Sequence, residues 1–122
     1  MKMHQASGQG KNLFTGYGPG HVLINGQRHD GNLIVSSDAI QSWAAADIAS
    51  LGAEHFDALL ALQPEVVLFG SGLNQRFVHP KLYAALTQAG IGFECMDTQA
   101  ACRTFNILLA EDRRVVAALL AI

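Results

Sequence analysis

The stretch LFGSGLNQRF (68–77) resembles a phosphate-binding turn, because a glycine-rich segment follows an apolar run. A P-loop ends in Gly-Lys-Ser or Gly-Lys-Thr, whereas Gly72 is followed by leucine and asparagine. A dinucleotide-binding turn needs a third glycine at Gln75 and a helix that begins at once, but the next predicted helix begins near Pro80. Both specific motifs fail. The stretch is therefore either a ligand-binding turn of another kind or a strand that ends in a flexible turn.

Small and polar residues end two successive predicted strands. Gly70, Ser71 and Gly72 follow the first strand, and Asp97 and Thr98 follow the next. In open α/β sheets, ligands bind in the crevice beyond the carboxyl ends of the strands. The helix after Thr98 directs its free N–H groups at the same edge, which favours an anion. These five residues are candidates for binding a small molecule or an anion, and the alternative is two strands that simply turn.

Two polar side chains of the following helix extend this candidate site. Arg103 carries a planar, five-donor cation suited to carboxylate or phosphate, and Asn106 both donates and accepts hydrogen bonds. Both lie on one side of the predicted helix with Gln99, and with the loop glycines they could frame a polar pocket. The alternatives are a solvated helix face and an arginine that ties down a neighbouring loop.

The sequence contains no recognisable catalytic or metal-binding set. None of the five histidines pairs with Cys, Asp or Glu at metal-ligand spacing. No serine lies in a Gly-x-Ser-x-Gly context. Cys95 and Cys102 do not form Cys-x-x-Cys, so we expect packed, reduced thiols, with a redox pair as the alternative. We therefore predict no catalytic residue, no metal and no cofactor, and leave enzymatic activity undecided.

Composition limits the classes of protein. The 122 residues predict one domain, and 50% hydrophobic with 15% charged residues exclude a disordered chain. The net charge of -2 argues against a nucleic-acid partner. No apolar window is long enough for a membrane span, and the start MKMHQASGQGKN does not have the pattern of a secretory signal, so we expect a cytoplasmic protein.

The elements that must position these residues alternate from residue 53 onward. Periodicity and turn residues predict helices over 53–64, 80–90 and 98–112, and strands over 65–72, 91–97 and 113–122. Asn25-Gly26 predicts a hairpin of residues 21–24 with 27–35, irregular near Asp30-Gly31. Residues 36–52 have no clean period, although we expect Trp43 to pack on the domain. The fold class is α/β: a three-layer single domain over 13–122, with a mixed, mostly parallel central sheet, an N-terminal β-hairpin and a flexible tail over 1–12.

The last predicted helix has the clearest core face. Its apolar residues gather on one side at 100° per residue, with Phe105 at the centre: Ala101, Cys102, Phe105, Leu108 and Leu109. The four residues 111–114 after it form a predicted charged turn.

Three segments together resemble a known family. They are MDTQAACRTFNILLAEDRRVVAALL (96–120), VVLFGSG (66–72) and GHVLINGQ (20–27). They are similar to an uncharacterised conserved α/β domain family that includes the mitochondrial complex I assembly factor 3 and an adipogenesis-associated cytosolic protein. The family's Gly-Thr-Gly turn corresponds to Gly70-Ser71-Gly72, and Asp112 stands where the family commonly has glycine. The resemblance implies a three-layer α/β fold with a mixed sheet and no established enzymatic activity.

Two functional hypotheses follow. The first is a non-catalytic protein-interaction or assembly-assisting module with an unknown protein partner, which the resemblance and the missing catalytic set favour. The alternative is a small-molecule- or anion-binding protein, with or without enzymatic activity, that uses the crevice at the strand ends.

Overall fold

The computed structural model describes residues 10–122. Its strands are β1 (Phe14–Gly18), β2 (His21–Ile24), β3 (Gln27–Asp30), β4 (Leu33–Val35), β5 (Ile40–Ser42), β6 (Val66–Ser71), β7 (Gly92–Met96) and β8 (Val115–Leu120). Its α-helices are α2 (Ala53–Asp57), α3 (Ala84–Gln88) and α4 (Thr98–Ala110), and its short 3₁₀ helices are η1 (Ile48–Ser50), η2 (Ala58–Leu62) and η3 (Pro80–Tyr83). Much of the predicted tail, residues 1–9, lies outside the described residues; Asn12 donates its backbone N–H to Ser37 O at 2.8 Å.

The central sheet is mixed, as the sequence predicts. Its strand order is β5-β4-β8-β6-β7, in which β6 is parallel to both β7 and β8 while β4 is antiparallel to β8 and β5. The α/β alternation after residue 53 therefore builds the parallel half, because each helix carries the chain back to start a strand in the same direction.

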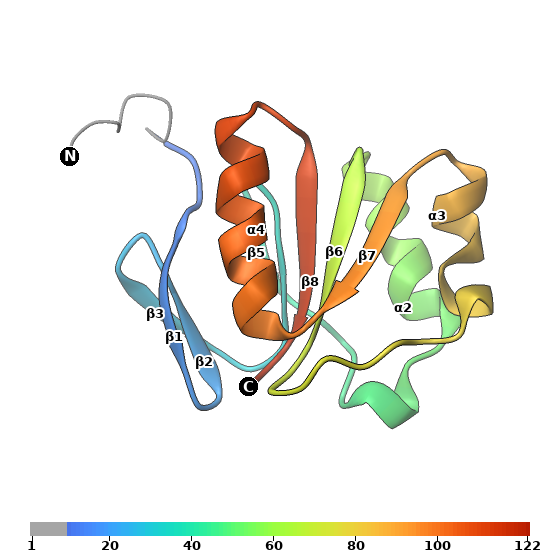
Figure 1. Cartoon of the computed structure of the whole chain (residues 1–122), viewed down its shortest axis with the longest axis horizontal. Coiled ribbons are helices and arrows are strands. Elements are labelled where there is room, and N and C mark those ends of the chain that lie inside the picture. The colour runs from blue at the N-terminus through green and yellow to red at the C-terminus, as the bar shows by residue number, and fades with distance from the viewer. Residues whose placement is uncertain (1–9) are drawn as a thin grey trace.

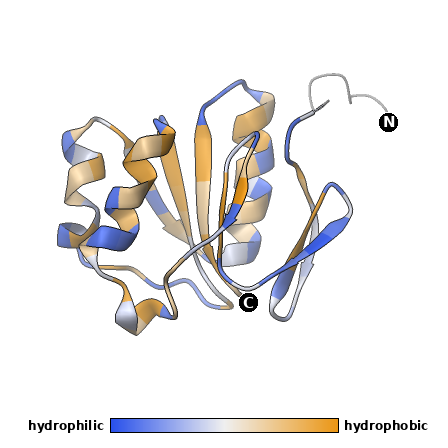
Figure 2. Cartoon of the chain, turned by 180° about the vertical axis from the view of Figure 1, so that it is seen from behind, coloured by the Kyte–Doolittle hydropathy of each residue, from blue (hydrophilic) through white to orange (hydrophobic). Residues whose placement is uncertain are grey.

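The central sheet is covered on both faces, which gives three layers (Figure 1). Alternate residues of β6 explain this. Val66 and Leu68 pack in one core with α4 and the small three-stranded sheet of β1, β2 and β3. Val67 and Phe69 pack in the other core with α2 and α3. β8 alternates in the same way. Figure 2 shows these apolar strands at the centre, between more polar outer segments. A strand buried on both faces reads as a continuous apolar run, and the sequence shows that run.

The predicted hairpin is confirmed at its turn and corrected at its end. Asn25 and Gly26 have φ of 52° and 81°, as a type I′ turn requires, and Ile24 pairs with Gln27. The second strand stops at Asp30, however, and Gly31 turns the chain at φ 83°. Residues 33–35 leave the hairpin and pair with β8 and β5 instead. All three are buried, and an exposed hairpin cannot cover an apolar run on both faces.

The small sheet has the order β1-β2-β3 and packs beside α4. Phe14 from β1 meets Phe105 from α4 edge-to-face, with ring centroids 5.1 Å apart. The predicted core face of α4 is confirmed, with Ala101, Cys102, Phe105 and Leu109 buried and Leu108 partly buried. Trp43 is buried as well, so it packs on the domain as expected.

Candidate functional site

The Gly70–Gly72 turn is fastened to the start of α4. Gly72 N–H donates to Thr98 Oγ1 at 2.9 Å, and Thr98 N–H donates back to Gly72 O at 2.9 Å. Thr98 Oγ1 donates to Leu120 O at 2.7 Å, so one buried hydroxyl joins the ends of β6, β8 and α4. A Cβ on Gly70 would lie 2.8 Å from that hydroxyl oxygen. Glycine at position 70 therefore permits the close approach of helix and strand.

The side chains of Ser71 and Asp97, like that of Thr98, already have hydrogen-bond partners within the fold. Ser71 Oγ accepts a hydrogen bond from Arg76 N–H at 2.9 Å and lies 2.7 Å from Asn74 O, to which it donates. Asp97 caps α4 by accepting from Ala100 N–H at 2.9 Å. The structure thus brings together the five candidates of the two strand ends, and it uses their polar groups to connect the strands to the helix.

A cavity of about 420 Å³ lies next to this turn. Its lining residues are Asn32, Ala46, Asp47, Ile48, Ser71, Gly72, Leu73, Asn74, Arg76, Leu120, Ala121 and Ile122. Arg76 is the only lysine or arginine among these described lining residues, and Asp47 brings the opposite charge. The strand-end crevice is therefore present as a cavity, and its lining includes one cation, Arg76, and one carboxylate, Asp47.

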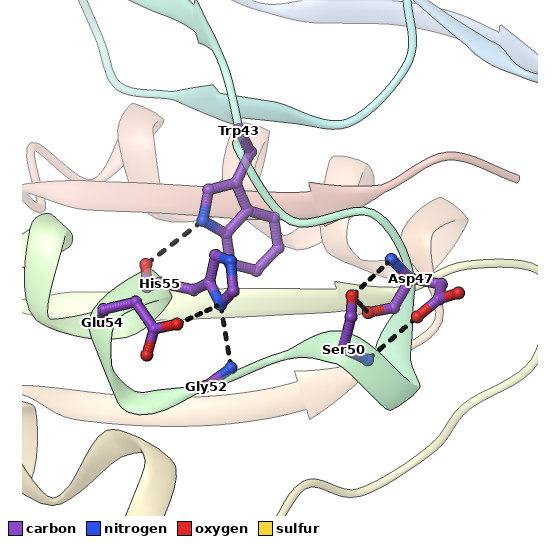
Figure 3. A network of polar contacts seen from close by, with 6 residues as sticks. All are labelled: Trp43, Asp47, Ser50, Gly52, Glu54 and His55. Carbon is purple, nitrogen blue, oxygen red and sulfur yellow. Dashed lines mark hydrogen bonds and ion pairs between the residues drawn. The ribbon is translucent and has the colours of Figure 1, made fainter.

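Asp47, one of the lining residues, belongs to the polar contacts drawn in Figure 3. Asp47 accepts from Ser50 N–H at 2.9 Å while Ser50 Oγ accepts from Asp47 N–H at 3.2 Å, which is a capping box for η1. His55 Nδ1 accepts from Gly52 N–H at 2.8 Å, and the indole N–H of Trp43 donates to His55 O at 3.2 Å. Since Nδ1 accepts, the neutral His55 ring carries its proton on Nε2. His55 anchors the start of α2, a structural role that its spacing alone did not reveal.

Arg103 and Asn106 point away from the Gly70–Gly72 turn, toward β1. The Asn106 amide donates to Phe14 O at 2.8 Å and accepts from Phe14 N–H at 2.9 Å. Arg103 Nη1 donates to the Tyr17 hydroxyl at 2.8 Å. Both residues line a second cavity of about 240 Å³, which shares no residue with the first. The predicted candidates therefore fall into two separate places, and ligand binding at either stays a prediction.

The cysteines are free, and neither thiol is activated. Burial raises the pKa of Cys102 to about 12, and it raises the pKa of Cys95 as well. A thiol of this kind carries almost no thiolate at neutral pH. Within residues 10–122, no group of three or more histidine, cysteine, aspartate or glutamate residues could hold a metal ion.

The turn after α4 is charged, as predicted, and it forms an ion-pair group with Glu65. The Arg114 backbone N–H and the Arg113 guanidinium donate to Glu65 Oε1, each at 3.0 Å. The bond from the Arg114 N–H is the main reason that the pKa of Glu65 lies below its usual value, and Arg113 lowers it further. The group connects the start of β6 to the start of β8, far from the strand-end cavity.

The sequence analysis missed the exposed apolar side chains. Leu73 and Phe77 lie in the loop after β6, Ile107 lies on α4, and each exposes more than half of its surface. Ile107 was detectable, because it falls outside the apolar stripe of its helix. Leu73 and Phe77 were detectable as apolar residues in a segment without period. No helix of the described residues is long and apolar enough to cross a membrane.

Comparison with known proteins identifies a matching family and several similar proteins. The model of a family described as "Protein of unknown function (DUF498/DUF598)" matches residues 14–120. An uncharacterized protein of Rhodobacter capsulatus is 39% identical over 86% of this chain and 81% of its own length. A Francisella tularensis protein named "13 kDa major membrane protein" is 28% identical over 94% of this chain and 95% of its own.

An assembly factor is a third relative. The zebrafish (Danio rerio) NADH dehydrogenase [ubiquinone] 1 alpha subcomplex assembly factor 3 is 33% identical over 85% of this chain, and the match spans 61% of that longer protein. Among solved structures, a Bordetella parapertussis protein superposes with a TM-score of 0.86 at 38% identity, covering 92% of this chain and 97% of the other.

Proposed function

The chain belongs to this family of unknown function, DUF498/DUF598, and from that premise we propose that it is a non-catalytic protein-interaction module that assists the assembly of other proteins. The similarity to assembly factor 3 supports the proposal, because the match covers most of this chain. The module is one α/β domain over residues 13–122. We propose that the protein acts in the cytoplasm. Its net charge of -2 favours a protein partner over a nucleic acid.

The observation that carries the proposal is an exposed surface, here called the α4 surface, composed of Arg103 and Ile107 of α4 and Tyr17 of β1, whose hydroxyl contacts Arg103. Ile107 exposes 59% of its surface and Tyr17 exposes 37%. Arg103 lies one helical turn before Ile107, and the Tyr17 hydroxyl fixes its guanidinium at 2.8 Å. Tyrosine and arginine are the residues most enriched at interface centres, and a pre-positioned arginine loses less entropy on binding. This α4 surface therefore has the composition and the rigidity of a binding site for another protein.

The test measures assembly in cells. In a bacterial host that has both this chain and a respiratory NADH dehydrogenase, the gene is deleted, and the amount of assembled enzyme is measured on native gels. We expect a decrease that the wild-type gene restores and Ile107→Asp does not. Gln88→Asp is the matched control, since it adds the same charge at an exposed position of another helix, α3.

Two results would count against the proposal. If deletion leaves the assembled enzyme unchanged, NADH dehydrogenase is not the target. If Ile107→Asp restores assembly as well as the wild type, the α4 surface is not the interface. Affinity purification of both variants at native expression then shows whether any protein is lost with Ile107.

The strand-end cavity supports a second function, binding of a small anion. Its volume of about 420 Å³ and the guanidinium of Arg76 favour this function, although the neighbouring Gly72 N–H is paired with Thr98. The experiment is a titration with phosphate and common nucleotides, followed by NMR shifts of the Gly70 and Gly72 amides. Binding predicts shifts that Arg76→Ala abolishes and Arg103→Ala retains. Flat shifts in the wild type would remove this function.

A further inference from the structure

The loop between β6 and η3 presents two large apolar side chains: Leu73, which also lines the strand-end cavity, and Phe77, which neither proposed function uses. In this loop, residues 72–79 and here called the tip loop, Phe77 exposes 77% of its surface and Leu73 exposes 67%. These are the highest values among the large apolar residues that the structure describes. The tip loop runs along the lower edge of the molecule in Figure 1. Two exposed apolar side chains four residues apart on one short loop are candidates for contact with an apolar surface.

The backbone of the tip loop is held in place between these two side chains. Arg76 N–H donates to Ser71 Oγ at 2.9 Å, and Ser71 Oγ donates to Asn74 O at 2.7 Å. The Gln75 amide reaches Cys95 O at 3.4 Å. Hydrogen bonds therefore fix the backbone of the loop in a conformation that leaves Leu73 and Phe77 exposed.

The charged side chains of the tip loop and of η3 are cations. Arg76 and Lys81 are both exposed, and no aspartate or glutamate occurs between Glu65 and Glu94 in the sequence. The acidic side chain that shares a cavity with Arg76 is Asp47, whose carboxylate accepts a hydrogen bond from Ser50 N–H at 2.9 Å. The tip loop thus combines exposed apolar side chains with neighbouring cations, in a chain whose net charge is -2.

We propose that the tip loop docks the protein reversibly on an anionic lipid surface, with Leu73 and Phe77 inserted and Arg76 and Lys81 at the lipid phosphates. Apolar side chains enter the boundary between headgroups and acyl chains, while long basic side chains keep their charge at headgroup level. Insertion and electrostatic attraction together supply the two signals that stable binding requires.

Co-sedimentation of the purified chain with lipid vesicles tests the proposal. The vesicles contain phosphatidylcholine alone or with about 30% phosphatidylglycerol, which supplies the negative surface. We expect the wild type to sediment with the anionic vesicles, and the Leu73→Ser/Phe77→Ser double variant to lose affinity by about tenfold or more. Ile107→Ser, which removes an exposed apolar side chain from α4, should bind as the wild type does. Unchanged melting temperatures establish that all variants are folded.

The charge of the tip loop is tested separately. Replacing Arg76 and Lys81 with glutamine should weaken binding to anionic vesicles by about fivefold for each cation. Sedimentation that is absent in the wild type, or unchanged in the double variant, would overturn the proposal. A wild type that does not sediment with vesicles but self-associates through Phe77 would also overturn it, because the tip loop would then contact protein. Ile107→Asp separates this proposal from the assembly role, since it affects assembly and leaves vesicle binding intact.

Discussion

Gly70→Ala tests whether the glycine-rich turn is a structural connection between strand and helix. The added Cβ would lie 2.7 Å from Leu119 Cδ2, 2.8 Å from Thr98 Oγ1 and 3.0 Å from Thr98 Cα. The last of these is a backbone atom, so rotation of a side chain cannot remove every clash. The helix α4 must move away from β6, or the strand must shift within a sheet that pairs it on both sides.

The expected cost follows from these contacts. Overpacking of a closed core costs about 1–3 kcal/mol. Displacing Thr98 also strains the hydrogen bonds of its hydroxyl with Gly72 and Leu120, each worth about 1 kcal/mol. We therefore expect a loss of about 2–4 kcal/mol in the free energy of unfolding. For 122 residues the entropy of unfolding is about 0.26 kcal/mol/K, so the melting temperature should fall by about 8–15 °C.

Gly92→Ala is the matched control, because Gly92 is also a strand glycine. Its Cβ would meet Val66 Cγ2 at 3.5 Å, which is an ordinary contact. Alanine there should leave the melting temperature unchanged or raise it slightly. The assay is thermal unfolding of both variants by circular dichroism, with urea unfolding as the second measure. If Gly70→Ala has the same melting temperature as Gly92→Ala, the strand and helix do not need the glycine, and the structural interpretation of this turn is wrong.

Four further substitutions test other parts of the fold, each by urea unfolding. Gly26→Val should cost about 1–3 kcal/mol, because its φ of 81° excludes a β-branched residue although the space is open; an unchanged midpoint would contradict the turn. Phe105→Ala should cost about 3–5 kcal/mol, since the ring is fully buried against Phe14. Asp112→Gly should stabilise by about 0.5–1 kcal/mol, because Asp112 has φ of 60°, a region that suits glycine. Glu65→Gln should destabilise the protein at neutral pH but much less in acid. The lowered pKa of Glu65 means that its contribution is present above the unfolded-state pKa and is lost as pH falls through the folded-state pKa. An equal loss at both pH values would refute the role of its charge.

The elements that the sequence predicts well are those with local signals. Asn25-Gly26 fixes a turn by two adjacent residues, and the spacing of Ala101, Phe105 and Leu109 fixes the core face of α4. The strand over 65–72 was predictable because its apolar run needs cover on both faces. In each case the physical cause lies within one element.

Partners that are distant in the sequence could not be predicted. Leu33 pairs with Leu119 across the central sheet, and Gly31, with φ of 83°, turns the chain between the hairpin and that sheet. The direction of Arg103 depends on where the small sheet packs, which no periodicity encodes. The five strand-end candidates were placed together by a topological rule, whereas the two helix candidates needed a tertiary contact that the rule does not describe.

Two polar residues of α4, Thr98 and Asn106, were candidates for ligand binding, and their hydrogen bonds give them a structural role instead. Thr98 and Asn106 each pair with backbone groups outside the helix: Thr98 with Gly72 and Leu120, Asn106 with both polar groups of Phe14. Asn106 thus supplies a donor and an acceptor where β1 has no neighbouring strand, and a free edge would otherwise need water or another chain. A ligand at either residue must replace these bonds, which costs about 1–3 kcal/mol for each buried group left unpaired. The side chains free to meet a partner are therefore the ones that the fold does not use, and the most exposed large apolar ones are Phe77 and Leu73 on the tip loop, followed by Ile107 on α4.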